Sequence, residues 1–345
     1  MFTPADSDFD NIRRDFGLPS EIRSVSELQR YDYEDGEPGS KEVRLIVKAE
    51  LSSGPQLVIR FKNEADVTLE GVEMQCRFAD ELRRSGILTP QQYKSNGAFA
   101  RQCQINGYDV IVTVEQFVEG ELKAVDPAVA RKTGELLANM HDIAEKNDLH
   151  VPNKVLFDPF APNDLFDFAS FASLEPLVGD GEKPLYEQIL QRYHAYREIL
   201  TPLARQPRYA VQGDISNCNL YQTPSGEIGV FDFNRCGDNN LFCDAVMQAV
   251  FEARLMDYPE RMEGEDRILA AFLCGYDSVR RFSEEQRRWY PYLFALIDGF
   301  WSSDIRWDES SLTNALHRGD TEGAKKWLET IWQRLNQVEE MPLGR

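Results

Sequence analysis

The stretch from residue 209 to residue 240 constrains the fold more than any other part of the chain. It contains two short apolar runs, 209–211 and 228–231, separated by a polar loop and a turn. Short apolar runs bounded by turn residues predict strands. Asp214 follows the first run closely and Asp232 follows the second directly, so each predicted strand delivers an aspartate to the loop at its end.

Asn219 lies five residues after Asp214 and completes a set of three polar side chains on these loops. Carboxylate and carboxamide oxygens are ligands for Mg²⁺, and a further carboxylate can accept the proton of an attacking hydroxyl. The set therefore predicts phosphoryl transfer, with Asp214 as the base and with Asn219 and Asp232 as magnesium ligands. Aspartate and asparagine are common in turns, so the prediction depends on the three residues together.

The spacing resembles that of the aminoglycoside phosphotransferase and choline kinase families, which are relatives of the protein kinases. Their usual pattern is His-Gly-Asp, an Asn five residues after the Asp, and a hydrophobic strand that ends in Asp-Phe-Gly or a variant of it. Here Gln212 replaces the His, and Asn234 replaces the Gly or Asp that often follows Asp-Phe. Glutamine can both donate and accept hydrogen bonds, and asparagine tolerates a positive φ better than most residues. Neither change removes a proton acceptor or a metal ligand.

The resemblance implies an α+β, bilobal protein-kinase-like fold, with a small antiparallel-sheet N-lobe that carries one helix and a larger, mainly helical C-lobe. A length of 345 residues suits two lobes. We expect a nucleotide-binding lobe over residues 1–117 and a catalytic, acceptor-binding lobe over residues 118–345, with ATP and Mg²⁺ in a cleft between them. The implied activity is transfer of the γ-phosphate of ATP to a hydroxyl of a small metabolite or amine.

The expected N-lobe strands lie between residues 22 and 62 and are separated by turns at 35–40 and 52–55. In the resembling kinases the first turn covers the nucleotide phosphates, although an ordinary hairpin turn explains its two glycines equally well. The third strand occupies the place of the cation that pairs with the α- and β-phosphates. Arg60 aligns best with that place, and Lys62 points to the same side. A basic, solvent-facing side of the strand is the alternative explanation for both.

A helix is expected over residues 63–85 and would supply the acidic partner of that cation. Glu73 is the candidate, and Glu70, one turn earlier, is its rival. The acidic position of the family can instead fall on Gln75, which would leave the ion pair incomplete.

A hairpin arm over residues 108–117 is expected, and its apolar strand VIVTVEQFVEG, residues 110–120, ends at Glu119-Gly120 and resembles the hinge between the lobes of such kinases. There, main-chain groups of Glu115, Phe117 and Val118 would bind adenine. A buried strand followed by a turn explains the pattern equally well. Because the contacts would be made by the main chain, the side chains do not discriminate between the two interpretations.

The C-lobe helices are expected from Asp126-Pro127 onward, where a capping residue precedes proline. His141 lies in this first helix and is interpreted as a packing residue. Further on, aromatic and acidic side chains gather within eleven residues: Asp298, Trp301, Asp304, Trp307 and Asp308. Aromatic faces with carboxylates suit an amine or a quaternary ammonium group. Tryptophans in a terminal helical region are more often core residues, so this group does not identify the acceptor.

The 58 acidic side chains outnumber the 38 basic ones and give a net charge of −20. This charge opposes binding to nucleic acid and favours a small, cationic acceptor. No apolar run approaches the length of a membrane span, and the N-terminal residues lack the basic and apolar regions of a signal peptide. Six cysteines without a Cys-x-x-Cys pair predict thiols in a reducing compartment. We therefore expect a cytoplasmic protein; its oligomeric state is not predicted.

Two alternatives share the fold. One is a kinase that phosphorylates a protein hydroxyl, and the other is a catalytically silent nucleotide-binding module of the pseudokinase type. The presence of Asp214, Asn219 and Asp232 argues against the silent module. The weak phosphate loop and Gln212 argue for it.

Overall fold

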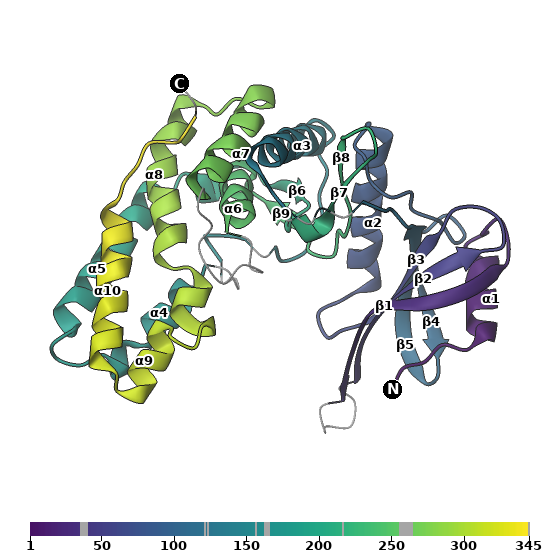
Figure 1. Ribbon diagram of the computed structural model, residues 1–345, viewed down its shortest axis with the longest axis horizontal. Helices are drawn as coiled ribbons and strands as arrows, with labels where there is room; N and C mark the ends of the chain where they lie inside the picture. The colour runs from purple at the N-terminus through teal and green to yellow at the C-terminus, as the bar shows by residue number, and fades with distance from the viewer. Residues whose placement is uncertain are drawn as a thin grey trace. The chain divides into compact units, whose positions relative to one another are not determined.

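The computed structural model describes residues 1–34, 41–120, 122, 124–155, 157–161, 166–215, 217–254 and 265–343 (Figure 1). The chain divides into two units. The first unit consists of Met1–Lys123, Leu149–Asn153 and Asn217–Cys236, and the second of Ala124–Asp148, Lys154–Ser216 and Gly237–Arg345. The first unit therefore holds Asn219 and Asp232 together with the N-terminal sheet. The expected turn at 35–40 lies outside the described residues.

A five-stranded antiparallel sheet forms the centre of the first unit, with the strand order β1-β2-β3-β5-β4. Its strands are β1 (Ile22–Glu34), β2 (Lys41–Leu51), β3 (Leu57–Asn63), β4 (Ala100–Ile105) and β5 (Tyr108–Gln116). The unit also contains the helices α1 (Asp6–Asp15) and α2 (Leu69–Arg84), and the short hairpin of β7 (Leu220–Gln222) and β8 (Ile228–Val230). This antiparallel N-terminal sheet confirms the fold that the sequence predicts.

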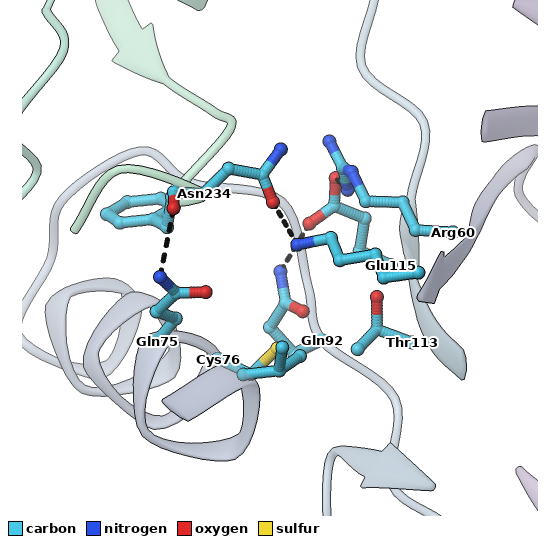
Figure 2. Close-up of a pocket in the computed structure, with 10 residues that line it drawn as sticks. Arg60, Gln75, Cys76, Gln92, Thr113, Glu115 and Asn234 are labelled. Atoms are coloured by element: carbon cyan, nitrogen blue, oxygen red, sulfur yellow. Dashed lines mark hydrogen bonds and ion pairs between the residues drawn. The ribbon is translucent and has the colours of Figure 1, made fainter. Parts of the chain in front are cut away.

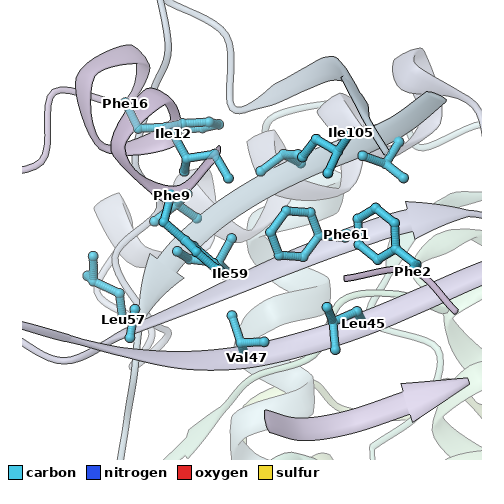
Figure 3. Packing of buried hydrophobic residues seen from close by; sticks show 14 of the residues in the cluster. Phe2, Phe9, Ile12, Phe16, Leu45, Val47, Leu57, Ile59, Phe61 and Ile105 are labelled. Carbon is cyan, nitrogen blue, oxygen red and sulfur yellow. The ribbon is translucent and has the colours of Figure 1, made fainter. Parts of the chain in front are cut away.

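The two faces of the sheet differ because successive side chains of a strand point to opposite sides. On one face, Leu57, Ile59 and Phe61 of β3 pack with aromatic and aliphatic side chains of α1 in the main core of the unit (Figure 3). Arg60 and Lys62 alternate with them and so point to the other face. There α2 contributes Val72, which packs with apolar side chains of β4 and β5. The apolar pattern of β3 thus directs both cations to the face that carries α2.

The second unit is mainly helical, as the sequence predicts. Its helices are α3 (Pro127–Lys146), α4 (Phe168–Ser173), α5 (Lys183–Ile199), α6 (Leu241–Ala253), α7 (Glu265–Val279), α8 (Glu284–Gly299), α9 (Leu312–Arg318) and α10 (Thr321–Asn336). Short strands β6 (Tyr209–Val211) and β9 (Gly237–Asn239) pair antiparallel. The expected cap of α3 is present, because the Asp126 side chain accepts a hydrogen bond from the Val129 amide at 2.8 Å. Every residue of α6 is buried, so this helix is the centre of the unit.

Helices α3 and α7 approach each other closely at two glycines. A Cβ atom on Gly134 would lie 2.0 Å from the Phe272 carbonyl oxygen, and one on Gly275 would lie 2.0 Å from the Arg131 carbonyl oxygen. The backbones therefore leave no room for a side chain at either position.

Glu252 of α6 is a buried acidic residue. It is 0 % exposed, and neither carboxylate oxygen accepts a hydrogen bond within the described residues. Burial raises the pKa of this carboxyl to about 8.

We predict that Gly134→Ala destabilises the protein by about 1–3 kcal/mol or more, because the added methyl group must push two helix backbones apart. The melting temperature should fall by several degrees. Gly181→Ala is the matched control, since a Cβ there meets no atom within 4 Å. Equal melting temperatures for the two variants would show that α3 and α7 do not pack on their backbones.

We also predict that Glu252→Gln removes a loss of stability that develops as the pH rises from about 4.5 to about 8. The folded chain keeps the Glu252 proton up to about pH 8, whereas the unfolded chain releases it near the ordinary value of 4.5. Folding therefore binds a proton between these values, and the contribution of this group to stability falls as pH rises, by at most about 1.4 kcal/mol per pH unit.

Urea unfolding at pH 5 and pH 8 measures this effect. The stability of Glu252→Gln relative to the natural protein should increase from pH 5 to pH 8. Glu187→Gln, at an exposed position of α5, should show no such trend. A constant difference for both variants would mean that Glu252 ionises normally in the folded protein.

Candidate active site

The hairpin of β7 and β8 brings the two predicted metal ligands, Asn219 and Asp232, to the same end. Leu220 is opposite Val230, and beyond this pair the Phe231 amide donates to the Asn219 carbonyl at 3.0 Å. Asn219 therefore precedes β7 where Asp232 follows β8. Asp232 has a φ of 57°, a conformation that is uncommon for residues other than glycine and is found at functional sites. Its side chain also accepts a hydrogen bond from the Asn234 amide at 3.1 Å.

Main-chain hydrogen bonds attach this hairpin to the rest of the first unit. The Gln222 amide donates to the Gly120 carbonyl at 2.8 Å, and the Val230 amide donates to the Leu88 carbonyl at 2.9 Å. Gly120 has a φ of 98°, and a Cβ atom there would lie 2.3 Å from the Gln222 carbonyl oxygen. Only glycine fits this position without displacement of the backbone. The segment after β5 and the hairpin that carries Asn219 and Asp232 are thus held together.

A small polar cavity of about 30 Å³ lies on the α2 side of the sheet (Figure 2). This volume corresponds to about two water molecules. The lining comes from β3, β5, α2, the segment between α2 and β4, and the segment after Asp232: Arg60, Lys62, Val72, Gln75, Cys76, Gln92, Thr113, Glu115, Phe233 and Asn234. The cavity therefore brings together the two candidate cations, one of the three helix positions considered for their partner, and the two residues that follow the predicted metal ligand Asp232.

The two cations of β3 have different partners. Arg60 forms a buried ion pair with Glu115, whose other carboxylate oxygen accepts from Gln92 at 2.6 Å. Burial opposes the charge of Arg60, but the carboxylates of Glu115 and Asp232 together outweigh this effect and raise the pKa of the guanidinium. Lys62 donates to the side-chain oxygen of Asn234, and no carboxylate of the described residues forms an ion pair with it. Burial, and next the Arg60 charge, lower the pKa of the Lys62 ammonium.

This arrangement separates the two candidates for the phosphate-binding cation. Arg60 aligned better in the sequence, but its charge is already balanced by Glu115. Lys62 is hydrogen-bonded to a neutral amide and forms no ion pair within the described residues, although the Asp232 carboxylate is close enough to act on its pKa, so its charge is less fully balanced than that of Arg60. The geometry favours Lys62.

Glu73 lies elsewhere and does not pair with either cation. Its carboxylate accepts from the amides of Phe99 and Ala100, at 2.7 and 2.9 Å, and from Arg77 at 2.8 Å. The expected partnership with the β3 cation is therefore corrected: the other possibility considered from the sequence, Gln75, occupies the cavity. Two residues of a helix that are two positions apart lie on different faces, which explains why only one of them reaches the cavity.

The three main-chain positions proposed for adenine differ in their existing bonds. The Phe117 amide donates to the Gln56 carbonyl at 2.8 Å, and Glu115 is opposite Val58 in the same antiparallel ladder. Since hydrogen-bonded pairs alternate along such a ladder, the main chain of Glu115 is bonded to β3 as well. In the described part of the chain, the main-chain groups of Val118 make no hydrogen bond. Among the described residues, the main-chain groups of Val118 and the Phe117 carbonyl are the ones that remain open to a ligand.

In the second unit, Asp214 follows β6 on a loop whose main-chain amides are hydrogen-bonded to two buried glutamine side chains. Its amide donates to the side chain of the fully buried Gln212 at 2.8 Å, and the next amide, of Ile215, donates to Gln248 of α6 at 2.9 Å. The Asp214 residue itself is half-buried. Gln212 thus bonds the loop directly, as the comparison with histidine led us to expect.

A buried network continues from Gln248 through the unit. Gln248 donates to Asp244 at 3.3 Å, Asp244 contacts His141 at 3.0 Å, and the other ring nitrogen of His141 is 2.8 Å from the Tyr276 hydroxyl. His141 is 1 % exposed, so it is a structural member of this network. Asp244 and Gln248 were not identified from the sequence. Their four-residue spacing, which Glu252 continues along a mostly apolar helix, was the available signal.

Two of the acidic residues suggested for a cationic acceptor already form ion pairs with arginines. Asp298 pairs with Arg254 at 2.5 Å, and Asp304 pairs with Arg334 at 2.5 Å. Trp301 is buried, with Arg254 stacked 5.3 Å from its ring centre. Asp308 is exposed, and the side chain of Trp307 lies outside what the structure describes. These paired carboxylates do not form an open acidic site for an amine.

The number of oxygen ligands at the end of the β7–β8 hairpin fits a magnesium ion bound with a nucleotide. Across the described residues there is no group of three or more His, Cys, Asp or Glu side chains placed to bind a metal together. Magnesium bound with a nucleotide keeps several waters and takes only one or two protein ligands besides the phosphates. Asn219 and Asp232 supply that number of oxygen ligands.

No helix in the described ranges is long and apolar enough to cross a membrane.

Comparisons with known proteins bear on the fold and the family. The family model described as "Phosphotransferase enzyme family" matches residues 43–290. A microcompartment-associated aminopropanol kinase superposes with a TM-score of 0.59 at 15 % identity, covering 94 % of this chain and 95 % of that chain. An amicoumacin kinase in complex with AMP-PNP, Ca²⁺ and Ami gives a TM-score of 0.54 at 14 % identity, covering 98 % and 96 %.

A spectinomycin phosphotransferase in complex with ADP and spectinomycin also gives a TM-score of 0.54, at 11 % identity, covering 97 % of this chain and 98 % of that chain. A search of curated protein sequences found no match. The structural similarities, at such low identity, establish the fold, and the family model covers most of the chain. The resemblance predicted from the sequence is confirmed: the chain belongs to the phosphotransferase enzyme family.

Proposed function

We propose that this protein is an ATP- and magnesium-dependent phosphotransferase that moves the γ-phosphate to a hydroxyl of a small metabolite or amine. Membership of the phosphotransferase family supports the reaction class. The observation that carries the proposal is the β7–β8 hairpin, which places Asn219 and Asp232 at one end. Asp214 lies only five residues before Asn219 in the chain.

Asn219 and Asp232 are the proposed magnesium ligands. When bound, the ion neutralises charge on the β- and γ-phosphate oxygens during transfer. Lys62 is the proposed contact for the α- and β-phosphates, because Glu115 already balances the charge of Arg60. Val118 is the proposed main-chain contact for adenine.

Asp214 is the proposed general base. Its loop is fixed by the buried glutamines Gln212 and Gln248, so the carboxylate is carried on a rigid segment. A base held in this way can accept the proton of the acceptor hydroxyl as the phosphoryl group is transferred.

The acceptor is proposed as a small hydroxylated molecule that bears an amine. The net charge of −20 favours a cation, and one similar structure is of an aminopropanol kinase. The arginine-paired carboxylates at Asp298 and Asp304 are not part of this argument. Phosphorylation of a protein hydroxyl and a silent nucleotide-binding module are the alternatives, and a cytoplasmic location remains a prediction.

We predict that Asp232→Ala weakens magnesium-dependent binding of ATP, whereas Asp214→Ala leaves it nearly unchanged. Asp232 is assigned to the metal and Asp214 only to the acceptor hydroxyl. Calorimetric titration with ATP and Mg²⁺ measures both, with the exposed Asp180→Ala as the control. Equal weakening by the Asp232 and Asp214 substitutions would refute the division of roles, and no binding by the natural protein would refute the proposed function.

We further predict that Asp214→Asn lowers kcat by a factor on the order of 10²–10⁴, which is about 3–5 kcal/mol of barrier. The substitution keeps the shape and removes the charge, so the KM for ATP should change little. Turnover is measured on folded protein with an acceptor found by screening hydroxylated amines. A purely structural Asp214 would instead give normal turnover and a loss of about 1 kcal/mol in stability.

A further inference from the structure

Asn234 makes three contacts around the cavity beside α2 (Figure 2). Its side-chain oxygen accepts a hydrogen bond from the Lys62 ammonium, and its carbonyl accepts one from the Gln75 side chain at 3.0 Å. Its amide donates to the Asp232 carboxylate at 3.1 Å. One residue thus connects the proposed phosphate-binding cation on β3, the helix α2 and a proposed metal ligand.

The backbone conformation of Asn234 does not explain why an asparagine stands there. Among the described residues other than glycine, positive φ occurs at Asn96, Asn106, Asp148 and Asp232. Asn234 is not one of them, so it does not replace glycine by adopting a left-handed conformation. The expectation drawn from the sequence on this point was wrong. What distinguishes Asn234 from glycine here is its side-chain oxygen, which holds Lys62.

Two of the departures from the family pattern, Gln75 and Asn234, contact each other. Gln75 stands where an acidic residue of α2 would pair with the cation, but its amide group donates to the carbonyls of Asn234 and Cys236, at 3.0 and 3.4 Å. A carboxylate has no proton to donate to these oxygens and would be repelled by them. Glutamine at 75 therefore suits a site in which the cation is held from the segment after Asp232 instead of from the helix.

We propose that Asn234 is a positioning residue that holds Lys62 for the phosphates of ATP in the role usually given to an acidic residue of α2, with Gln75 fixing the main chain of Asn234. The inference rests on the proposed function. A neutral acceptor orients the ammonium without forming an ion pair with it, so the cation can still pair with the phosphates. Because Asn234 also donates to Asp232, the cation and the metal ligand are held by the same residue.

A double-mutant cycle tests this role. Asn234→Ala should weaken the binding of ATP with Mg²⁺ on the order of tenfold, since the lost bond involves a charged donor. In a Lys62→Met background, the same substitution should change the ATP Kd by less than about twofold, because Asn234 acts through Lys62. Titrations are carried to millimolar ATP so that the weak variants remain measurable.

Asn11→Ala is the matched control. The Asn11 side chain accepts a hydrogen bond from the Arg14 guanidinium in the same unit, outside the proposed ATP site, so its loss should leave the ATP Kd unchanged. Urea unfolding of the four proteins of the cycle without nucleotide tests the contact itself. The combined shift of the midpoint should be smaller than the sum of the separate shifts.

Gln75→Glu provides a second, opposite test. If the chain simply lacks an ion pair, restoring the acid should tighten ATP binding, which would overturn the inference. Our account predicts weaker binding, because the carboxylate faces two carbonyl oxygens and draws Lys62 away from Asn234. Gln104→Glu adds the same charge at an exposed position of β4 and should have no effect.

The outcomes separate this inference from the proposed function. ATP binding by the natural protein with equal effects of Asn234→Ala in both backgrounds would overturn the inference alone. The absence of ATP binding by the natural protein would overturn the proposed function and, with it, the role of Asn234 toward phosphates.

Discussion

The attachment of the β7–β8 hairpin to the segment after β5 is the constraint on which the candidate site depends. Hydrogen bonds from Gln222 to Gly120 and from Leu122 to Leu220 join main chains that are about a hundred residues apart in sequence. The contact between Gly120 and the Gln222 carbonyl excludes any side chain. Through this attachment, Asn219 and Asp232 belong to the same unit as the sheet that carries Lys62. The proposed ligands of the metal and of the phosphates are therefore held by one set of backbone hydrogen bonds.

Buried ionisable groups in the two units differ in the partners that stabilise them. Some are balanced: Arg60 by Glu115 and Gln92, and Asp244 by hydrogen bonds from His141 and Gln248. Breaking one partner of such a set leaves a buried charge that is costly to keep. Lys62 differs from these groups, because its hydrogen bond goes to a neutral amide and it forms no ion pair within the described residues. The balanced groups hold the structure, whereas Lys62 keeps a charge that a phosphate can use.

Much of the fold was predictable from local patterns, and the site less so. The alternation of β3 correctly directed Arg60 and Lys62 to one face, and the spacing of Asp214, Asn219 and Asp232 indicated the family. The choice between Arg60 and Lys62 was not predictable, because it depends on Glu115, which is 55 residues from Arg60 in sequence. Glu73 and Gln75 both lie on α2, and only the orientation of the helix decides which one faces the cavity. Asn234 was misjudged because a sequence pattern suggests backbone conformation more readily than a contact with a distant lysine.

The central claim is that the chain transfers phosphate from ATP to a hydroxyl and does not merely bind nucleotide. Phosphorus-31 NMR of the protein with ATP, Mg²⁺ and a panel of hydroxylated amines measures this directly, because a phosphomonoester, inorganic phosphate and the γ-phosphate of ATP give separate signals. The account predicts that, with at least one acceptor, the γ-phosphate signal is replaced by that of a phosphomonoester as ADP forms. ATP that stays bound and unchanged with every acceptor, including protein hydroxyls, would contradict it and identify a silent nucleotide-binding module.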